Sequence, residues 1–257
     1  MTEQLTTRLP QFYLTSPAPC PYLAGKRESK VFTHLSGTDA DALNNALTHI
    51  GFRRSQNIIY RPACQGCQAC ISVRIPAADF KPSANMRRIM QRNADLDVSV
   101  LNAAADEEQF SLLRSYLDAR HAEGGMMEMT ALDYIAMIEE TPVNTHIVEY
   151  RLKHHFGNLR SDGSRDHVKG PLLGLALTDN LEDGLSMVYS FYDPDEDRRS
   201  LGTFMVLDHI ARAAKTHIPY VYLGYWVKNS PKMDYKSRFR PLEALGPQGW
   251  YPLLPAR

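Results

Sequence analysis

The sequence predicts an α/β protein in which helices flank a mixed sheet and a smaller cysteine-containing region precedes it. β-rich runs at 146–152, 171–178 and 186–192 are followed by a helix that opens near Arg199 and by a strand at 220–227. This order places an antiparallel meander beside a parallel crossover within one sheet. Hydrophobic residues make up 44% of the 257 and charged residues 23%, which are ordinary values for a globular protein and argue against disorder.

The N-terminal third predicts short elements after a turn-rich start. Three prolines within residues 17–21 exclude a helix there. Apolar spacing predicts a helix over 39–50, and short apolar runs at 58–60 and 71–75 predict strands on either side of a cysteine-rich loop. Ser83 stands where it would cap a basic helix.

The middle of the chain is helical before it becomes β-rich. The spacing predicts an acidic amphipathic helix over 106–122 and a second helix capped by Thr130. Asp183-Gly184 marks a hairpin turn, and a polar loop that holds His154 and His155 separates the first two strands of the meander. We therefore expect two parts: a cysteine-bearing region over 1–98 and the mixed-sheet domain over 99–257.

All four cysteines lie in the first third of the chain, at Cys20, Cys64, Cys67 and Cys70. A C-x2-C-x2-C spacing in a chain without an export signal favours thiolate ligation of zinc or an iron–sulfur cluster, with Cys20 as a fourth ligand, over disulfides. The ferredoxin pattern continues to a fourth cysteine followed by proline, whereas Ile71 and Ser72 follow here. Reduced or redox-sensing thiols are the alternative.

The net charge is zero, but the charges are unevenly distributed. Residues 1–100 carry 12 basic and 7 acidic side chains and residues 212–257 carry 8 and 2, whereas residues 101–149 carry 2 and 10. If the two basic ends meet in space, they form a positive face suited to a polyanion such as tRNA. A dispersed, solvated set of charges is the alternative, also for the basic helix after Ser83.

The motifs exclude several classes of protein. No catalytic triad, zinc-protease motif or phosphate-binding P-loop is present, so hydrolase and nucleotide-hydrolysing functions lose support. No stretch approaches the roughly 20 apolar residues that a bilayer span requires, and the first residues contain no apolar signal segment. We expect a cytoplasmic protein without membrane association.

One turn has the geometry of an anion site. The helix that opens after Arg198 directs free backbone N–H groups and the positive end of its dipole toward one spot, which suits a phosphate. The residues expected to bind an anion there are Arg198, Arg199, Ser200, Gly202 and Thr203. The β-β-β-α-β order around this turn resembles the core of GNAT-type acyltransferases, which implies that the acceptor amine enters between splayed strands.

Several segments together closely resemble one family over the whole chain, the arginyl/leucyl-tRNA–protein transferases. The residues that carry the resemblance are Cys20-Pro21-Tyr22, Gly51-Phe52-Arg53-Arg54-Ser55, Tyr60 through Cys70, Arg74, Ser200-Leu201-Gly202-Thr203, Tyr222-Leu223-Gly224-Tyr225 and Pro231 through Lys236. The length and the cysteine-rich block look most like the bacterial branch, the aspartate/glutamate leucyltransferases. Eukaryotic relatives hold a cluster with N-terminal cysteines, but the triplet here differs from their pattern.

The resemblance implies transfer of leucine from leucyl-tRNA to proteins that begin with Asp or Glu, which marks them for degradation through the N-degron pathway. An aminoacyl ester is already activated, so the chemistry requires no essential cofactor. An acyl-CoA-dependent GNAT-type N-acyltransferase and a non-catalytic, metal-containing tRNA-binding or redox-sensing module are the alternatives.

Two further sets of residues are candidates for the site. Polar groups near the expected strand ends could relay a proton, namely Tyr192, Asp193, Tyr225, Asp234 and Tyr235. A carboxylate that enters a partly buried pocket needs a paired cation, best supplied by arginine. The basic residues beside the family motifs therefore predict a pocket for the acidic N-terminus, formed from Arg54, Arg61, Arg74, Lys236 and Arg238, with Arg53 and Lys232 in the same stretches.

Overall fold

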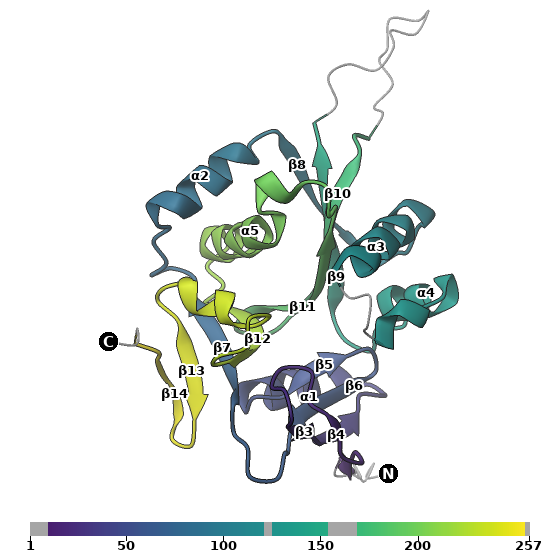
Figure 1. Ribbon diagram of the computed structural model, residues 1–257, viewed down its shortest axis with the longest axis vertical. Coiled ribbons are helices and arrows are strands. Elements are labelled where there is room, and N and C mark those ends of the chain that lie inside the picture. Colours follow the sequence, from purple (N-terminus) through teal and green to yellow (C-terminus); the bar gives the residue numbers. More distant parts are fainter. Residues whose placement is uncertain (1–9, 121–124, 154–168, 255–257) are drawn as a thin grey trace, which may run out of the picture.

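The computed structural model describes residues 10–120, 125–153 and 169–254. Its main element is an eight-stranded mixed sheet with the order β14-β13-β7-β12-β11-β10-β9-β8 (Figure 1). The strands are β7 (Cys70–Pro76), β8 (Leu96–Asn102), β9 (Thr145–Leu152), β10 (Leu172–Asn180), β11 (Gly184–Tyr192), β12 (Tyr220–Val227), β13 (Glu243–Gly246) and β14 (Gly249–Pro252). The predicted α/β class with a mixed sheet is confirmed.

The centre of the sheet has the predicted connectivity. β9, β10 and β11 form an antiparallel meander, and β12 pairs parallel to β11 after the crossover helix α5 (Leu201–Lys215). The β11–β12 ladder is short, because its register runs only from Gly184↔Tyr220 to Ser186↔Tyr222. Beyond that point the two strands diverge, as the resemblance to the core of GNAT-type acyltransferases implied.

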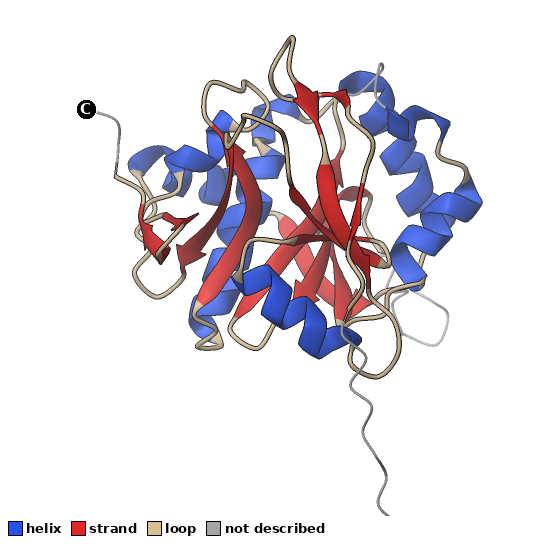
Figure 2. Cartoon of the chain, turned by 90° about the horizontal axis from the view of Figure 1, so that it is seen from below, coloured by secondary structure: helices blue, strands red, loops and turns tan. Residues whose placement is uncertain are grey.

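Helices cover both faces of the sheet (Figures 1 and 2). α2 (Ala84–Arg92) and α5 pack over one core cluster, with α2 on the outer side of α5, while α3 (Glu107–Arg120) and α4 (Ala131–Glu139) pack over the other face. The predicted caps are confirmed: Ser83 accepts a hydrogen bond from Met86 N, and Thr130 forms a capping box with Asp133. A short 3₁₀ turn (Gly125–Glu128) precedes α4. None of the described helices is long and apolar enough to cross a membrane.

The N-terminal part has a small core of its own beside the main sheet, at the lower end of Figure 1. A four-stranded sheet with the order β1-β4-β6-β5 packs with α1 (Ala40–His49), and β2 and β3 form a separate pair. The strands are β1 (Tyr13–Leu14), β2 (Ala18–Pro19), β3 (Arg27–Glu28), β4 (Lys30–His34), β5 (Arg53–Ser55) and β6 (Ile58–Pro62). β7 leaves this part and joins the main sheet between β12 and β13, and residue 98, the expected boundary, lies within β8.

Candidate active site

The diverging strands hold the side chain of Arg53 between them. Its Nη2 atom donates to the main-chain oxygens of Met187 at 2.9 Å and Val188 at 2.5 Å, on the edge of β11 that β12 has left. The facing residue on β12 is Gly224, with φ +72°. A Cβ built on Gly224 would stand 1.8 Å from Arg53 Nη1, so only glycine lets the guanidinium lie there.

Lys236 is buried next to this guanidinium, in the short 3₁₀ helix η3 (Asp234–Arg238). Its Nζ donates to the main-chain oxygen of Tyr225 at 2.6 Å. Burial, and then the positive charge of Arg53, lower the pKa of Lys236 well below its ordinary value. The Tyr225 hydroxyl lies 2.9 Å from the main-chain oxygen of Gly51 and 3.0 Å from that of Tyr60, and these two acceptors share its one proton. Burial raises the pKa of Tyr225. These contacts tie β12 to the N-terminal part.

A second group of phenols lies at the carboxyl end of β11. The ring of Tyr192 packs edge-on against Tyr116 of α3, with centroids 5.1 Å apart, and it also covers Gly202 in the first turn of α5. Burial raises the pKa of Tyr235, and the nearby charge of Arg53 opposes the rise. Tyr192 lies close by, and Tyr235 as a whole remains 39% exposed. Of the predicted catalytic residues, Tyr225 and Tyr235 therefore both lie near Arg53, and Tyr192 lies near Tyr235.

The two predicted catalytic aspartates have different surroundings. Asp193 follows β11 directly and accepts a hydrogen bond from the main-chain nitrogen of Asp195 at 2.9 Å. Asp234 is exposed at the start of η3, where its main-chain oxygen accepts from Ser237 Oγ at 2.7 Å, and its carboxylate has no hydrogen-bond partner among the described residues. A catalytic role for either remains a prediction.

The predicted anion-binding turn has the expected backbone conformation, but its Arg199 is already paired with carboxylates. Ser200 adopts the left-handed conformation, with φ 54°, and the N–H groups of Leu201 and Gly202 meet no acceptor within the described residues. Arg199 is bound in a fork to Asp95, at 2.8 and 2.9 Å, and its Nε donates to Glu196. Arg198 is exposed, and Thr203 lies in the first turn of α5 with its N–H bonded to Ser200. Phosphate binding here remains a prediction.

The structure separates the residues that were predicted to bind an acidic N-terminus. Arg54 is buried against Asp179, and Arg74 pairs with Glu243 while its guanidinium lies 3.5 Å from the ring centroid of Tyr220. Arg61 and Arg238 are exposed. Among the described residues, Arg61, Lys236 and Arg238 have no carboxylate partner, and their roles in binding remain predictions.

The four cysteines lie near one another but do not form a ligand set in this arrangement. Burial, and then the neighbouring thiolates of Cys64, Cys20 and Cys67, raise the pKa of Cys70 to about 11. All four are free thiols, and Cys64 Sγ donates to Ser29 O at 3.7 Å. Across the described ranges, no three Cys, His, Asp or Glu side chains have the arrangement needed to hold a metal ion. Metal binding therefore remains a prediction.

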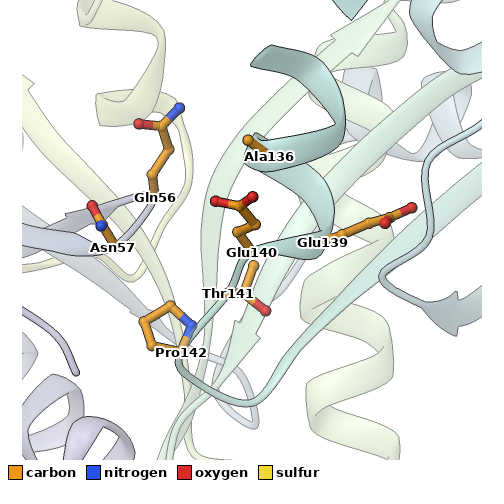
Figure 3. A pocket seen from close by; sticks show the side chains of 7 residues that line it. All are labelled: Gln56, Asn57, Ala136, Glu139, Glu140, Thr141 and Pro142. Carbon is orange, nitrogen blue, oxygen red and sulfur yellow. The ribbon is translucent and has the colours of Figure 1, made fainter. Parts of the chain in front are cut away.

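A separate pocket of about 380 Å³ opens between the β5–β6 turn and the end of α4 (Figure 3). Glu140 lies on the side that faces Gln56 and Asn57, while Glu139 turns away from them. None of the predicted site residues lines this pocket. Since its only charged groups are carboxylates, it does not suit a phosphate or an acidic peptide.

Comparisons with known proteins show the family of this chain. The sequence profile described as "Arginine-tRNA-protein transferase, C terminus" matches residues 108–246, and the profile for the N terminus of the same family matches residues 18–88. The chain belongs to this transferase family. A protein of Parvibaculum lavamentivorans named "Aspartate/glutamate leucyltransferase" is 60% identical over 97% of this chain and 98% of its own length. One of the same name from Afipia carboxidovorans is 58% identical over 96% and 94%.

Solved structures resemble this transferase more distantly. The structure titled "L-PGS from Bacillus licheniformis" has a TM-score of 0.46 at 9% identity and covers 66% of this chain and 49% of its own. A region described as a GCN5-related glucosamine N-acetyltransferase of a fungal multi-domain protein has a TM-score of 0.40 at 9% identity, with coverages of 86% and 22%.

Arg53 is the site residue whose place the sequence did not indicate. It lies beside Arg54 within the family motif, and alternation along a strand predicts only that the two side chains point to opposite faces. The signal in the sequence is Gly224 inside the strand-like run Tyr222 through Tyr225, because a glycine within a strand often marks a close approach of another group.

Proposed function

We propose that this transferase moves leucine from leucyl-tRNA to the α-amine of proteins that begin with Asp or Glu, as a step of N-degron degradation in the cytoplasm. The observation that carries the proposal is the 60% identity to an aspartate/glutamate leucyltransferase over nearly the full length of both chains. The diverging β11 and β12, with the phenols at their ends, support it as a place for the reacting groups.

The reaction needs positioning more than activation. The amine attacks the ester carbonyl, the tetrahedral intermediate collapses, and the terminal ribose hydroxyl of the tRNA leaves with a proton. An N-terminal amine has a pKa of ~7.7–8, so a substantial fraction is neutral at physiological pH. Holding amine and ester in a reactive geometry contributes roughly 7–11 kcal/mol. We propose that the hydroxyls of Tyr192, at the end of β11, and of Tyr235, in η3, pass the proton from the amine to the ribose.

The exposed side of α2 supports binding of the tRNA acceptor stem. Arg87, Arg88 and Arg92 lie on this side, and the helix holds no acidic residue in its first turn. Arg92 Nη1 donates to the main-chain oxygen of Arg198, and Asn93 Nδ2 to that of Arg199 at 2.9 Å. In the described part of the chain, these three α2 arginines and Arg198 have no carboxylate partner. We propose that the stem follows α2 and that its 3′ end reaches the first turn of α5.

Recognition of an acidic first residue requires a cation that the protein has not neutralised. Within the described residues, Arg61 and Arg238 at the surface meet this condition. The charge of Arg53 favours an anion at the open end of the strands, although its Nη2 is already bound to β11. Lys236 meets the condition once a bound carboxylate raises its lowered pKa again. A site built for a carboxylate should reject the amide, because Asn or Gln would leave the cation without its partner.

The test uses purified protein, tRNA separately charged with leucine or arginine, and peptides that begin with Asp, Glu, Asn or Gln. We expect the Asp and Glu peptides to gain the mass of one leucine with leucyl-tRNA, and the Asn and Gln peptides to react far more slowly. Acetyl-CoA replaces the charged tRNA in a parallel reaction. Acetylation of the peptides, or tRNA binding that leaves every ester intact, would contradict the proposal.

A further inference from the structure

Arg53 takes the place of missing ladder hydrogen bonds. In a continuous parallel pair, main-chain N–H groups of β12 would donate to oxygens on this edge of β11. The ladder stops at Ser186↔Tyr222. At the next residues the pairing of β11 with β10 skips Val188, and this irregularity lets the oxygens of both Met187 and Val188 accept from Arg53 Nη2. Two acceptors of β11 are thereby satisfied without closure of the two strands.

Gly224 forms the other half of this arrangement. Its left-handed backbone coincides with a shift in the pairing of β12 with β7, between Tyr222 and Gly224. The absence of a Cβ lets the guanidinium lie against the backbone of β12, and Nη1 is buried there without a hydrogen-bond partner within the described structure. One side chain from the N-terminal part therefore contacts both strands where they separate.

We propose that Arg53 is a positioning residue that holds β11 and β12 apart and so maintains the passage along which the aminoacyl ester meets the amine. This inference rests on the proposed transfer reaction. Removal of the guanidinium leaves two main-chain oxygens to be satisfied by water or by approach of β12, and either change displaces the strand ends that carry Tyr192 and Tyr225. A displacement of about 1 Å costs on the order of 100-fold in rate.

The experiment compares Arg53→Met, Arg53→Lys and Gly224→Ala in the full chain. Leucine transfer is followed in single turnovers at saturating leucyl-tRNA and peptide, and amide exchange is followed in β11 and β12. We expect Arg53→Met to lower the transfer rate on the order of 100-fold and to change exchange at Met187 through Tyr189. Arg53→Lys, which keeps the charge but lacks the fork, should fall between Arg53→Met and the unaltered protein.

Gly224→Ala should impair transfer because its Cβ displaces the same guanidinium. Since that contact is absent in Arg53→Met, the double variant should lose less than the product of the two single losses. Arg27→Met is the control, because Arg27 Nη2 also donates to a main-chain oxygen, that of Pro17, but on the exposed surface. It should transfer leucine at the normal rate.

The outcomes separate this inference from the proposed function. If the unaltered protein transfers no leucine, the proposed function is wrong. If it does, then normal rates in Arg53→Met, or independent losses for Arg53 and Gly224, overturn the positioning role. If Arg53→Met does not fold, the decision passes to Arg53→Lys: normal transfer and exchange in that variant would overturn the inference.

Discussion

The two ends of the β11–β12 region differ in how buried cations are paired. We call the end where the ladder from Gly184 to Ser186 holds the strands together the closed end, and the end where they diverge the open end. At the closed end, Arg54 Nε and Nη2 each meet an oxygen of Asp179 at 2.6 Å, and both side chains are 1% exposed. At the open end, the neighbouring Arg53 meets only main-chain oxygens. Two adjacent residues of β5 thus differ in whether their charge is cancelled, and the uncancelled charge lies where an anionic substrate is expected.

A second pair of residues repeats the contrast. Arg74 donates to Glu243 at 2.8 Å and to the Tyr222 hydroxyl at 3.0 Å, and it lies 3.7 Å from Asp183. Lys236 is equally buried, but within the described part of the chain it donates only to the main-chain oxygen of Tyr225. The carboxylates around Arg54 and Arg74 make these cations part of the fold. At the open end, Arg53 contributes a charge that no carboxylate cancels, and the fold bears the cost of burying it. Lys236, whose pKa burial lowers, gains its proton more readily when a carboxylate binds beside it.

The largest expected effect tests the closed end. Arg54→Met leaves Asp179 buried without its partner, so we expect the free energy of unfolding to fall by about 3–5 kcal/mol. The double variant Arg54→Met/Asp179→Leu should recover most of this loss, because both charges are then removed. Denaturant unfolding measures both. If Arg54→Met stays stable but accepts Asn-starting peptides as well as Asp-starting ones, Arg54 belongs to the substrate pocket and the contrast fails.

The next effect is a pH dependence of the closed end, where His146 lies opposite Thr178 in the sheet. Burial, and then the charge of Arg212, lower the pKa of His146 from 6.5 to about 4, and its Nε2 has no partner within the described structure. Between these values the unfolded chain binds the proton and the folded protein does not. Stability should therefore fall as the pH drops from 6.5 to 4, by about 3 kcal/mol in total.

His146→Phe should remove this contribution to the acid slope, by which we mean the loss of unfolding free energy as the pH falls. Denaturant unfolding at pH 7 and pH 5 measures it. Burial also lowers the pKa of His209 well below its ordinary value, so part of the slope should remain in the variant. Leucine transfer by His146→Phe at pH 7 should be normal, since the residue lies at the closed end. An unchanged acid slope would show that His146 is not the neutral buried group described here.

The sequence predicts the elements that depend on neighbouring residues but does not predict the ion pairs between residues far apart in the chain. The meander, the crossover helix and the caps at Ser83 and Thr130 follow from periodicity and from capping residues within a few positions. The partners of Arg54 and Arg199 lie 125 and 104 residues away, at Asp179 and Asp95. No local pattern reports such pairs, so a sequence cannot tell a neutralised arginine from a free one.

The sheet shows the same limit. The run at 71–75 is recognisable as a strand, but its place between β12 and β13 depends on chain that lies more than 140 residues away. The β13–β14 hairpin covers that edge and was not predicted, because its four-residue strands have little apolar alternation. The open end of the site arises from these distant pairings.

A smaller effect should come from the open-end lysine. Because burial lowers its pKa, Lys236 binds fewer protons when folded than when unfolded, so its contribution to stability rises with pH up to the ordinary lysine pKa of about 10.4. Lys236→Met should reduce this rise in unfolding measured from pH 7 to pH 10. A carboxylate bound beside Lys236 raises its pKa and restores its proton, so the same variant should also narrow the rate difference between Asp- and Asn-starting peptides. At pH 7, a lower free energy of unfolding in Arg54→Met together with a higher one in Lys236→Met would sharpen the contrast between the two ends.

The smallest effect concerns the surface that leads to the open end. Arg88 on α2 is exposed and has no ion-pair partner in the described ranges, so Arg88→Gln should leave folding and the rate at saturating tRNA unchanged. If it contacts one phosphate, its loss lowers the slope of log affinity against log salt by about 0.7–0.9 and raises KM for leucyl-tRNA several-fold. Lys26→Gln is the matched control, because Lys26 is exposed in the turn between β2 and β3, at the far end of the molecule from α2 (Figure 1). Equal salt slopes in the two variants would place the acceptor stem on another face, whereas a lower slope in Arg88→Gln alone would show that the cations left free on α2 lead the tRNA to the open strands.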